Sequence, residues 1–482
     1  MYQFRPVVYV IGLLLTPLGL GMLVPVGVDV AFQNPDWQVF LGSSVLTLFA
    51  GISLVMATRG SGRDLTLRQA FLMITLAWAV LPAFAALPFV FSELGLSYTD
   101  AYFEAMSGLT TTGSTVISGL DAAPPGILIW RAILQWLGGL GIIVVAIAVL
   151  PVLKIGGMQL FRVESFDTTG NIIPRARQLA AAMMRLYLAL TVVCAIVYMA
   201  GGMTPFEGFA HAMTTIATGG YSTSDASIGH FDSAVIEFSA VLFMILGSLP
   251  FVLYLQLVRG RPLALWRDSQ VRTFMALIAG LVAFVVIWLL VAKGYDLSQA
   301  LRQGTFNVVS IVTGTGYSSS DYSAWGTFAV TLFLVFFFIG GCAGSTSCGI
   351  KIFRYEVLFR SMVSQTRRIH RPHGVFQPTY NGRPLSQNVI NSVISFLLLF
   401  FASFVVLSVA LALTGLDPIT AISGAGTALA NVGPGLGETI GPAGTFGAIP
   451  TSAKWILSFA MLLGRLELFT VLVIFTPAFW RA

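Results

Sequence analysis

The sequence Gly220-Tyr221-Ser222-Thr223-Ser224-Asp225 follows a short apolar segment, and a near copy, Gly316-Tyr317-Ser318-Ser319-Ser320-Asp321, follows another further along the chain. Two related turns bring the number of glycine-bearing turns to four: Thr111-Thr112-Gly113-Ser114, Thr218-Gly219-Gly220-Tyr221, Thr315-Gly316-Tyr317 and Asn431-Val432-Gly433-Pro434. Internal repetition is the sequence sign of a fold built from stacked or ring-arranged copies. Four polar turns in a hydrophobic chain therefore predict a ring of ion-coordinating loops.

The composition is that of a membrane protein. Of 482 residues, 56% are hydrophobic and 10% are charged, whereas soluble domains carry about 25% charged residues. This length accommodates about ten membrane spans of ~20 residues each. The first apolar run, 6–28, is too long for a signal-peptide core and lacks a small-x-small cleavage site, so we expect a retained span.

The basic residues predict the orientation in the membrane. When the spans alternate from an inside N-terminus, most of the 26 lysines and arginines fall on the cytoplasmic side. The outer side receives only Arg131, Lys293, Arg302 and Lys454. This positive-inside pattern predicts that both termini are cytoplasmic. It also accounts for the net charge of +6 without nucleic-acid binding.

The acidic residues show the reverse bias, and several of them flank the four turns. Examples are Asp100, Glu104, Asp225 and Glu438. Two interpretations remain open. These acids are either solvated loop surface or a negative outer mouth that concentrates cations.

A repeating unit surrounds each turn: a long apolar span, a short apolar segment, the glycine turn and a second long span. Two N-terminal spans in 1–68 precede the units, which are predicted at 69–153, 178–258, 271–369 and 388–478. Polar basic linkers separate them at 154–177, 259–270 and 370–387. The predicted fold is an all-α polytopic membrane protein whose four repeats surround one pore in a pseudo-fourfold arrangement.

The short segments carry helix-start signals and are too short to span a bilayer. Thr204-Pro205-Phe206-Glu207 is a capping box with proline at the first helical position. Asp417-Pro418 is the equivalent signal in the fourth unit, and Asp100 and Ser298 are the predicted caps in the first and third. The helix 205–216 has about 12 residues, or ~18 Å, against a hydrocarbon core of ~30 Å. Each short helix should enter from outside and stop halfway.

The turns at the ends of these helices should line a pore. Irregular backbone at membrane depth is tolerated where it faces a water-filled path, and its carbonyl groups can replace the hydration shell of an ion. Glycine permits the necessary backbone conformations, and neutral oxygen ligands suit a hard cation. The alternative is that small residues simply pack helices closely, but four turns at matching positions favour ion binding. The candidate ion ligands are Thr111, Thr112, Gly113, Thr218, Gly219, Gly220, Thr315, Gly316, Asn431, Val432 and Gly433.

These motifs resemble those of the Trk/Ktr/HKT potassium transporter superfamily, and most of all its TrkH-type bacterial membrane subunits. The resemblance covers essentially the whole chain, and it rests on residues 110–114, 217–225, 315–317, 340–351 and 431–437. It implies a pseudo-fourfold pore and potassium uptake across the bacterial inner membrane, with K⁺ as the transported ion and no organic cofactor in this chain. It further implies a homodimer in membrane lipid, gated by a cytoplasmic TrkA-type nucleotide-binding regulatory subunit.

Carried onto this sequence, the resemblance assigns four filter glycines: Gly113, Gly220, Gly316 and Gly433. The turn Gly314-Thr315-Gly316-Tyr317 is the one most similar to a potassium-channel filter, and the other three depart from it. Channel-like flow and coupling to sodium or protons, as in a symporter, both remain open.

The second span of the third unit contains a run that should break a membrane helix, Gly340–Gly349. It is either a movable loop below the filter or a static unwound segment. The resemblance supports an intramembrane gate, within 340–350 of the third repeat. The candidate gate residues are Gly340, Gly341, Gly344, Ser345, Gly349, Lys351 and Arg465.

Arg465 is a charge placed deep in an apolar segment, Ile456–Ile474. It lies about 14 residues from the outer end near Thr451, or ~20 Å of helix, where a guanidinium should face water or a partner. Glu467, two residues on, lies on a different helix face. Arg465 is therefore either an electrostatic barrier in the pore or half of an ion pair with another helix.

Other functions find little support in the sequence. No Walker A pattern, metal-ligand spacing or catalytic constellation occurs, so we predict neither an enzyme nor a metal or haem site. His211 is expected to be packed or to face the mouth. A coupled transporter for another solute would need a charged binding site at the midplane, which is not apparent. The basic segment Arg354–Arg371 could anchor to the membrane or dock a regulatory subunit.

Overall fold

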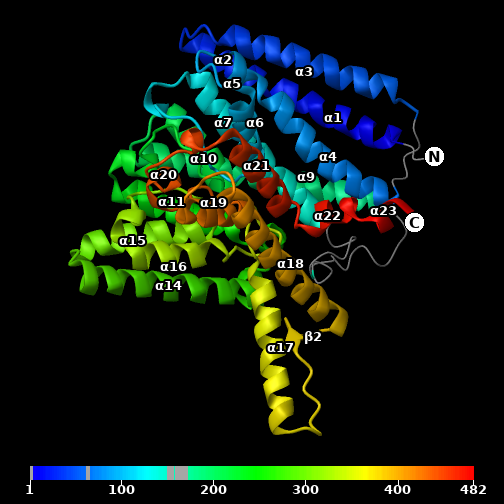
Figure 1. Cartoon of the computed structure of the whole chain (residues 1–482), viewed down its shortest axis with the longest axis vertical. Coiled ribbons are helices and arrows are strands. Elements are labelled where there is room, and N and C mark those ends of the chain that lie inside the picture. The colour runs from blue at the N-terminus through cyan, green and yellow to red at the C-terminus, as the bar shows by residue number, and fades with distance from the viewer. Residues whose placement is uncertain (1–3, 61–65, 149–156, 158–171, 482) are drawn as a thin grey trace.

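The computed structural model describes residues 4–60, 66–148, 157 and 172–481, which form a helical protein (Figure 1). Seven helices are long and apolar enough to cross a membrane, and two bent helix pairs pass the same test when each is taken as one span. The two strands within these residues, β1 (Thr379–Tyr380) and β2 (Arg383–Pro384), form a short antiparallel hairpin with Thr379 opposite Pro384. The predicted all-α membrane fold is confirmed.

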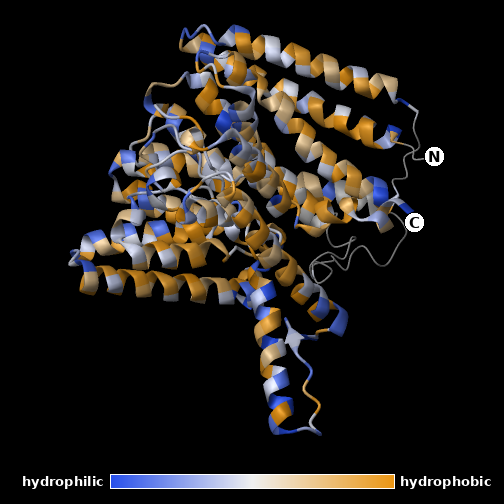
Figure 2. Cartoon of the chain, in the orientation of Figure 1, coloured by the Kyte–Doolittle hydropathy of each residue, from blue (hydrophilic) through white to orange (hydrophobic). Residues whose placement is uncertain are grey.

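Two spans precede the first repeat. α1 (Arg5–Gly21) continues into α2 (Leu23–Ala31), and α3 (Trp37–Ala57) lies along α1. Gly12 and Gly51 let the two backbones approach closely, because a Cβ on Gly12 would lie 2.8 Å from the carbonyl oxygen of Gly51. The outer face of α3 exposes apolar side chains, in keeping with a lipid environment (Figure 2).

Four similar groups of helices follow. The first contains α4 (Leu67–Ala85), α5 (Leu87–Phe91), α6 (Tyr98–Leu109), the 3-10 turn η1 (Leu120–Ala122) and α7 (Pro125–Ala148). The second contains α9 (Ile172–Ala200), α10 (Pro205–Ile216), η4 (Ser227–Phe231), α11 (Ala234–Ser248) and α12 (Phe251–Val258). Most of the predicted linker 154–177 lies outside the described residues, whereas α13 (Ala264–Arg267) lies in the linker 259–270.

The third group contains α14 (Ser269–Lys293), α15 (Leu297–Val312), η5 (Tyr322–Trp325), α16 (Thr327–Phe337) and α17 (Ile352–His370). The fourth contains α18 (Gln387–Ala412), α19 (Pro418–Ala430), α20 (Gly437–Ile440), η6 (Phe446–Ala448), α21 (Thr451–Arg465), α22 (Phe469–Leu472), η7 (Val473–Phe475) and α23 (Pro477–Arg481). Polar α17 projects from the helical body together with the β hairpin (Figures 1 and 2).

The four short helices α6, α10, α15 and α19 have 12, 12, 16 and 13 residues and are too short to span the bilayer. The capping box at the start of α10 forms as predicted: Thr204 accepts from the Glu207 backbone N–H at 3.3 Å, and Glu207 accepts from the Thr204 N–H at 2.9 Å. Asp417 caps α19 by accepting from Thr420 N–H at 3.1 Å.

The predicted caps of α6 and α15 were wrong by two or three residues. Ser97 caps α6 by accepting from the backbone N–H of Asp100 at 3.2 Å, so Asp100 lies inside the first turn. Asp296 caps α15 by accepting from the N–H of Gln299 at 3.0 Å, and Ser298 lies within the helix. Asp296 has the extended backbone that a cap requires, with φ −70° and ψ 161°.

The second spans of the repeats are less regular than the sequence suggests. α11 and α12 meet at 93° next to Pro250, which cannot continue a helix. α21 and α22 meet at 108°, so the expected continuous span Ile456–Ile474 is wrong. The bend forms because Glu467 and Leu468 adopt positive φ angles of 62° and 47°, a conformation incompatible with a right-handed helix.

We predict that Asp296→Ala lowers the unfolding free energy by about 1 kcal/mol, because the first turn of α15 loses its cap. The matched control, Ser298→Ala, should change it by less than ~0.5 kcal/mol. Denaturant unfolding of the purified protein in detergent measures both. A larger loss in Ser298→Ala would contradict the assignment of the cap.

Candidate functional site

The four predicted turns share one backbone conformation. Each has a left-handed residue, then an ordinary one, then a left-handed glycine. The first positions are Thr111, Thr218, Gly314 and Asn431, with φ angles of 52°, 50°, 73° and 52°; the glycines are Gly113, Gly220, Gly316 and Gly433, with φ angles of 87°, 78°, 84° and 119°. Positive φ is a genuine outlier for β-branched threonine, and such strain gathers at functional sites.

Hydrogen bonds at the ends of the short helices explain this conformation. The backbone N–H groups of Thr112, Gly219, Thr315 and Val432 donate to carbonyl oxygens five residues earlier, at 2.9, 2.8, 2.9 and 3.0 Å. In each turn the preceding N–H donates three residues back, as Thr111 does to Gly108 at 3.0 Å. This pair of bonds is the Schellman motif, which ends a helix with a left-handed residue. Each short helix thus ends in the same way and leads directly into its turn.

The structure brings the four turns into a closed ring. A Cβ on Gly113 would lie 2.2 Å from the carbonyl oxygen of Gly219 in the second turn. A Cβ on Gly220 would lie 2.0 Å from Thr315 O in the third turn, and a Cβ on Gly316 would lie 2.0 Å from Val432 O in the fourth. Gly433 closes the ring, because a Cβ on this residue would lie 2.8 Å from Thr112 O in the first turn. Each glycine therefore abuts the carbonyl of the next turn, and no larger residue fits.

The carbonyl oxygens that meet these glycines lie one residue before the glycine of their own turn. Three of them, those of Thr112, Thr315 and Val432, accept no hydrogen bond from the described residues. The fourth, Gly219 O, accepts from Gln135 Nε2 at 2.6 Å, while Gln135 Oε1 accepts from Tyr221 N–H at 3.0 Å. Neutral main-chain oxygens with free lone pairs at one level of a ring can coordinate a cation.

A cavity of about 250 Å³ opens at one side of the ring. All four turns contribute to its lining, through Gly113, Gly220, Gly316 and Pro434 among others. At its rim Asp225 accepts from the N–H groups of Gly119 and Leu120 at 2.8 and 3.1 Å. A hydrogen bond from Ser224 lowers the pKa of Asp121 on the same side below its usual value, so this carboxylate is ionised at neutral pH.

The tyrosines of the second and third turns each hydrogen-bond to the short helix of the preceding repeat. Tyr221 Oη donates to the carbonyl oxygens of Glu104 and Ser114, at 2.9 and 3.1 Å. Tyr317 Oη donates to His211 O at 3.2 Å, and it also contacts Thr214. Glu104 and His211 occupy equivalent places, nine residues before Gly113 and Gly220 in this numbering. The two near-identical sequence stretches therefore make the same inter-repeat contact.

A buried ion pair behind the first two turns was not predicted from the sequence. Arg131 Nε lies 2.8 Å from Glu104 Oε1, and the two side chains are 1% and 0% exposed. Arg131 also donates to Ser222 O at 2.8 Å and lies over the Tyr221 ring at 4.0 Å. Glu104 accepts from the Val116 N–H at 2.9 Å. The pair thus fixes the loops that follow the turns, and Glu104 is no surface charge of the mouth.

Most other acids near the turns are also committed to structure. Glu207, Asp296 and Asp417 cap the short helices. Glu237 and Asp232 pair with Arg302, each at 2.7 Å. The acidic bias of this side therefore reflects helix capping and ion pairs more than a field of free charge. His211 is fully buried, with its ring nitrogens 2.9 Å from Glu207 O and 3.0 Å from Ser222 Oγ.

The glycine-rich run 340–351 is an irregular buried loop on the other side of the ring. It contacts three of the four turns. Thr346 Oγ1 lies 3.2 Å from Thr218 Oγ1, Ser347 Oγ donates to Thr313 O at 2.6 Å, and Cys348 Sγ lies 3.7 Å from Thr111 Oγ1. Among its glycines, Gly340 and Gly349 approach so closely that a Cβ on Gly340 would lie 2.9 Å from Gly349 C.

The same loop is anchored to the bend between α11 and α12. Cys342 N–H donates to Ser248 O at 3.0 Å, and Phe251 N–H donates to Gly344 O at 3.0 Å. Within the loop, Ser345 Oγ donates to Cys342 O at 2.7 Å, and Gly341 N–H donates to Ser347 Oγ at 2.9 Å. The loop is therefore held both to the ring and to this bend.

Arg465 lies against this loop and is 2% exposed. Its Nη1 atom is 2.6 Å from Cys348 Sγ and 3.4 Å from Thr346 O, and its Nη2 donates to Gly138 O at 2.9 Å. No carboxylate pairs with it among the residues that the structure describes. A cavity of about 20 Å³, with room for one water, separates it from Lys351 and Glu467.

Glu467 pairs with a different arginine, Arg354, at the start of α17. The Arg354 side chain is fully buried and lies 3.6 Å from the centre of the Phe396 ring. Lys351, between the loop and α17, donates to Ser347 O. The bend of the fourth repeat is therefore tied to the segment that follows the loop, a contact that the sequence did not reveal.

Comparisons with known proteins give the chain a family context. The family model named TrkH and described as a cation transport protein matches residues 36–482. The Trk system potassium uptake protein TrkI of Halomonas elongata is 44% identical over 480 residues, which cover 99% of this chain and 97% of that protein. The Trk system potassium uptake protein TrkH of Escherichia coli K12 is 38% identical, over 99% of this chain and its own full length.

A solved structure has the same architecture. The crystal structure of the potassium transporter TrkH from Vibrio parahaemolyticus superposes with a TM-score of 0.92, at 38% identity, over 100% of both chains. These relatives are named as transport proteins rather than enzymes.

We predict that Gly220→Ala destabilises the protein far more than Gly119→Ala. The two glycines have φ angles of 78° and 77°, but only at Gly220 would the new Cβ meet a neighbour, Thr315 O at 2.0 Å. Gly119→Ala should lower the unfolding free energy by about 1–2 kcal/mol, because alanine is strained in the left-handed conformation. Gly220→Ala should lower it by a larger amount. Thermal unfolding in detergent compares them, and equal midpoints would show that the turns do not abut.

Proposed function

The chain belongs to the TrkH family of cation transport proteins, and on this premise we propose that it carries potassium into the cell across a bacterial inner membrane. The observation that best supports this function is the ring of four turns, in which Thr112, Gly219, Thr315 and Val432 present carbonyl oxygens to the preceding turn's glycine. In this proposal the ring is a selectivity filter. K⁺ is its cargo, bound by main-chain and threonine oxygens in place of water.

The half-length helices favour a cation at this point. Their C-terminal ends carry partial negative charge, and all four end at the ring. The filter ligands we propose are the eleven residues predicted from the sequence, from Thr111 to Gly433, with Gln135 and Tyr221 as supports. We propose that the short helices enter from outside the cell, so that the 250 Å³ cavity is the outer mouth and both termini are cytoplasmic.

We further propose that the loop 340–350 is a gate, seen here in a closed position. Its contacts with Thr111, Thr218 and Thr313 support this role. The space between the loop and Arg465 is about 20 Å³, far too small for a hydrated ion. The guanidinium of Arg465 has no carboxylate partner among the described residues, so it adds an electrostatic barrier below the ring.

Regulation and assembly complete the proposal. The relatives are named as parts of a Trk system, which supports a system of more than one component. We propose that a cytoplasmic TrkA-type nucleotide-binding subunit acts on the gate and that this chain forms a homodimer. The projecting helix α17 follows the gate directly and ends in Arg367, Arg368 and His370, so it is suited to receive such a partner. Coupling to sodium or protons, as in a symporter, is distinguished from channel-like flow by potassium flux in liposomes under imposed gradients of each ion.

We predict that the chain restores growth of a potassium-uptake-deficient bacterium on low potassium and that Gly316→Ala abolishes this rescue. The reason is the overlap of the new Cβ with Val432 O, 2.0 Å away. Gly119→Ala, outside the ring, should retain rescue, and immunoblots of membranes should show equal amounts of all three proteins. Rescue by Gly316→Ala at normal affinity would contradict the filter assignment.

We predict that Arg465→Ala raises potassium flux in liposomes about tenfold, which corresponds to removal of ~1.4 kcal/mol from the barrier. Shortening of the loop 340–350 should raise flux as well. Lys293→Ala, which changes a basic side chain near Trp288 and far from the loop in sequence, serves as the control. Wild-type flux in both Arg465→Ala and the shortened protein would rule out a gate at this place.

A further inference from the structure

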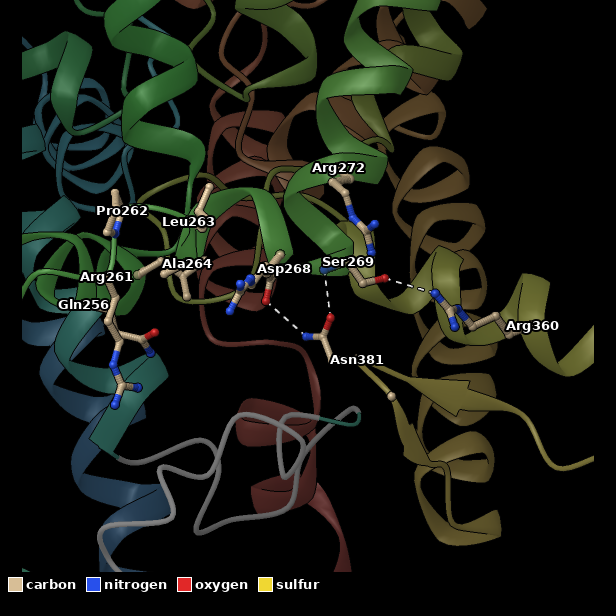
Figure 3. Close-up of a pocket in the computed structure, with 13 residues that line it drawn as sticks. Gln256, Arg261, Pro262, Leu263, Ala264, Asp268, Ser269, Arg272, Arg360 and Asn381 are labelled. Carbon is tan, nitrogen blue, oxygen red and sulfur yellow. Dashed lines mark hydrogen bonds between the residues drawn. The ribbon is translucent and has the colours of Figure 1, made fainter.

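A cavity of about 780 Å³ lies away from the ring, at the junction of α12, α13, α14 and the β hairpin (Figure 3). Four arginines line it, Arg261, Arg267, Arg272 and Arg360, together with one carboxylate, Asp268. α12 ends and α14 begins here, so the cavity lies where two spans meet the membrane surface. This is the side on which the sequence predicts the cytoplasm.

The one acid in the lining, Asp268, interacts electrostatically with Arg272, but it hydrogen-bonds to none of the four arginines among the contacts that the structure describes. Asp268 Oδ1 accepts from the N–H groups of Gln270 and Val271, at 3.0 and 3.3 Å, and so caps α14. Its other oxygen accepts from Asn381 Nδ2 at 3.1 Å (Figure 3). Among the residues that the structure describes, Asp268 therefore accepts hydrogen bonds only from the first turn of α14 and from the hairpin.

Three of the four guanidinium groups are available to a ligand. Arg360 is engaged, since it donates to Glu356, to Ser269 Oγ at 3.1 Å and to Thr379 O at 2.6 Å. Among the residues that the structure describes, the side chains of Arg261, Arg267 and Arg272 have neither a hydrogen bond nor an ion pair. Three guanidinium groups in the lining of one cavity suit a phosphate group, which guanidinium binds through charge-assisted hydrogen bonds.

Apolar side chains beside the cavity indicate that lipid is close. Leu263, which lines the cavity, is 55% exposed, and the neighbouring Trp266 and Val258 are 65% and 78% exposed. Exposed tryptophan is typical of the interface between hydrocarbon and water. Basic pockets between spans on the cytoplasmic side bind anionic lipid headgroups.

We propose that this cavity binds the phosphate headgroup of an anionic phospholipid from the inner leaflet, with Arg261, Arg267 and Arg272 as its ligands. The acyl chains lie along Val258, Leu263 and Trp266. The headgroup holds the end of α12 and the start of α14 together, two elements that otherwise meet through the short α13.

The site is mechanically connected to the loop 340–350. Gln270, on the first turn of α14, accepts from the Ala343 N–H at 2.9 Å. Ser269 donates to Glu356 on α17. A bound headgroup therefore steadies the helix start that holds one end of this loop. The lipid site itself does not depend on the proposed transport function.

The test is thermal unfolding of the delipidated full-length protein in detergent, with phosphatidylglycerol or phosphatidylcholine added at equal mole ratio. Phosphatidylglycerol should raise the unfolding midpoint by several degrees, phosphatidylcholine should not, and added salt should reduce the shift. In the triple variant Arg261→Gln/Arg267→Gln/Arg272→Gln, at least three quarters of the shift should disappear. The matched control Arg259→Gln/Arg367→Gln/Arg371→Gln, with three exposed arginines outside the cavity, should keep it.

The remaining arms separate this proposal from simpler ones. Glycerol phosphate and inorganic phosphate should give less than a quarter of the shift; an equal shift would show a site for free phosphate and overturn the lipid assignment. If the control variant also lost the shift, the effect would depend on general surface charge rather than on this cavity, and the proposal would be wrong. Native mass spectrometry of bound phosphatidylglycerol, which does not depend on stability, should show at least a fivefold loss in the triple variant, and undiminished binding would overturn the proposal.

Discussion

The contact between each left-handed glycine and the carbonyl oxygen of the next turn is the constraint on which the rest of the structure depends. It sets how closely the four turns approach, and it is cyclic, since the fourth turn returns to the first. The Schellman ends of the short helices orient the carbonyls, the caps fix where these helices begin, and the tyrosines hold neighbouring repeats in register. Each of these features helps to hold the four glycine–carbonyl contacts in place.

The buried arginines differ in their partners. On the mouth side, Arg131 meets Glu104 and Arg302 meets Glu237, so the charges are paired and stabilise loops. On the other side Arg354 pairs with Glu467, whereas Arg465 contacts carbonyl oxygens, a thiol and the Trp78 ring but no carboxylate of the described residues. A charge without a counter-ion is costly at this depth, which is the physical argument for giving Arg465 a functional role and the paired residues a structural one.

Much of this arrangement could be read from the sequence because it is encoded locally. Glycine and threonine in repeated turns, the capping box at Thr204 and the apolar lengths of the spans all depend on neighbours within a few residues. The cap at Asp296 was missed because Ser298 offers an equally plausible side chain, and only backbone geometry separates them. The Arg131–Glu104 pair and the bend at Glu467 depend on tertiary contacts, and residues 466–468 of that bend include neither proline nor glycine.

The ring consists of four unequal quarters of a single polypeptide. In a homotetramer every amino-acid change at such a place is made four times at once. Here Asn431-Val432 can stand opposite Thr218-Gly219 within one molecule. In this chain a single substitution alters one quarter of the ring and leaves the other three unchanged, so the four quarters can differ from one another.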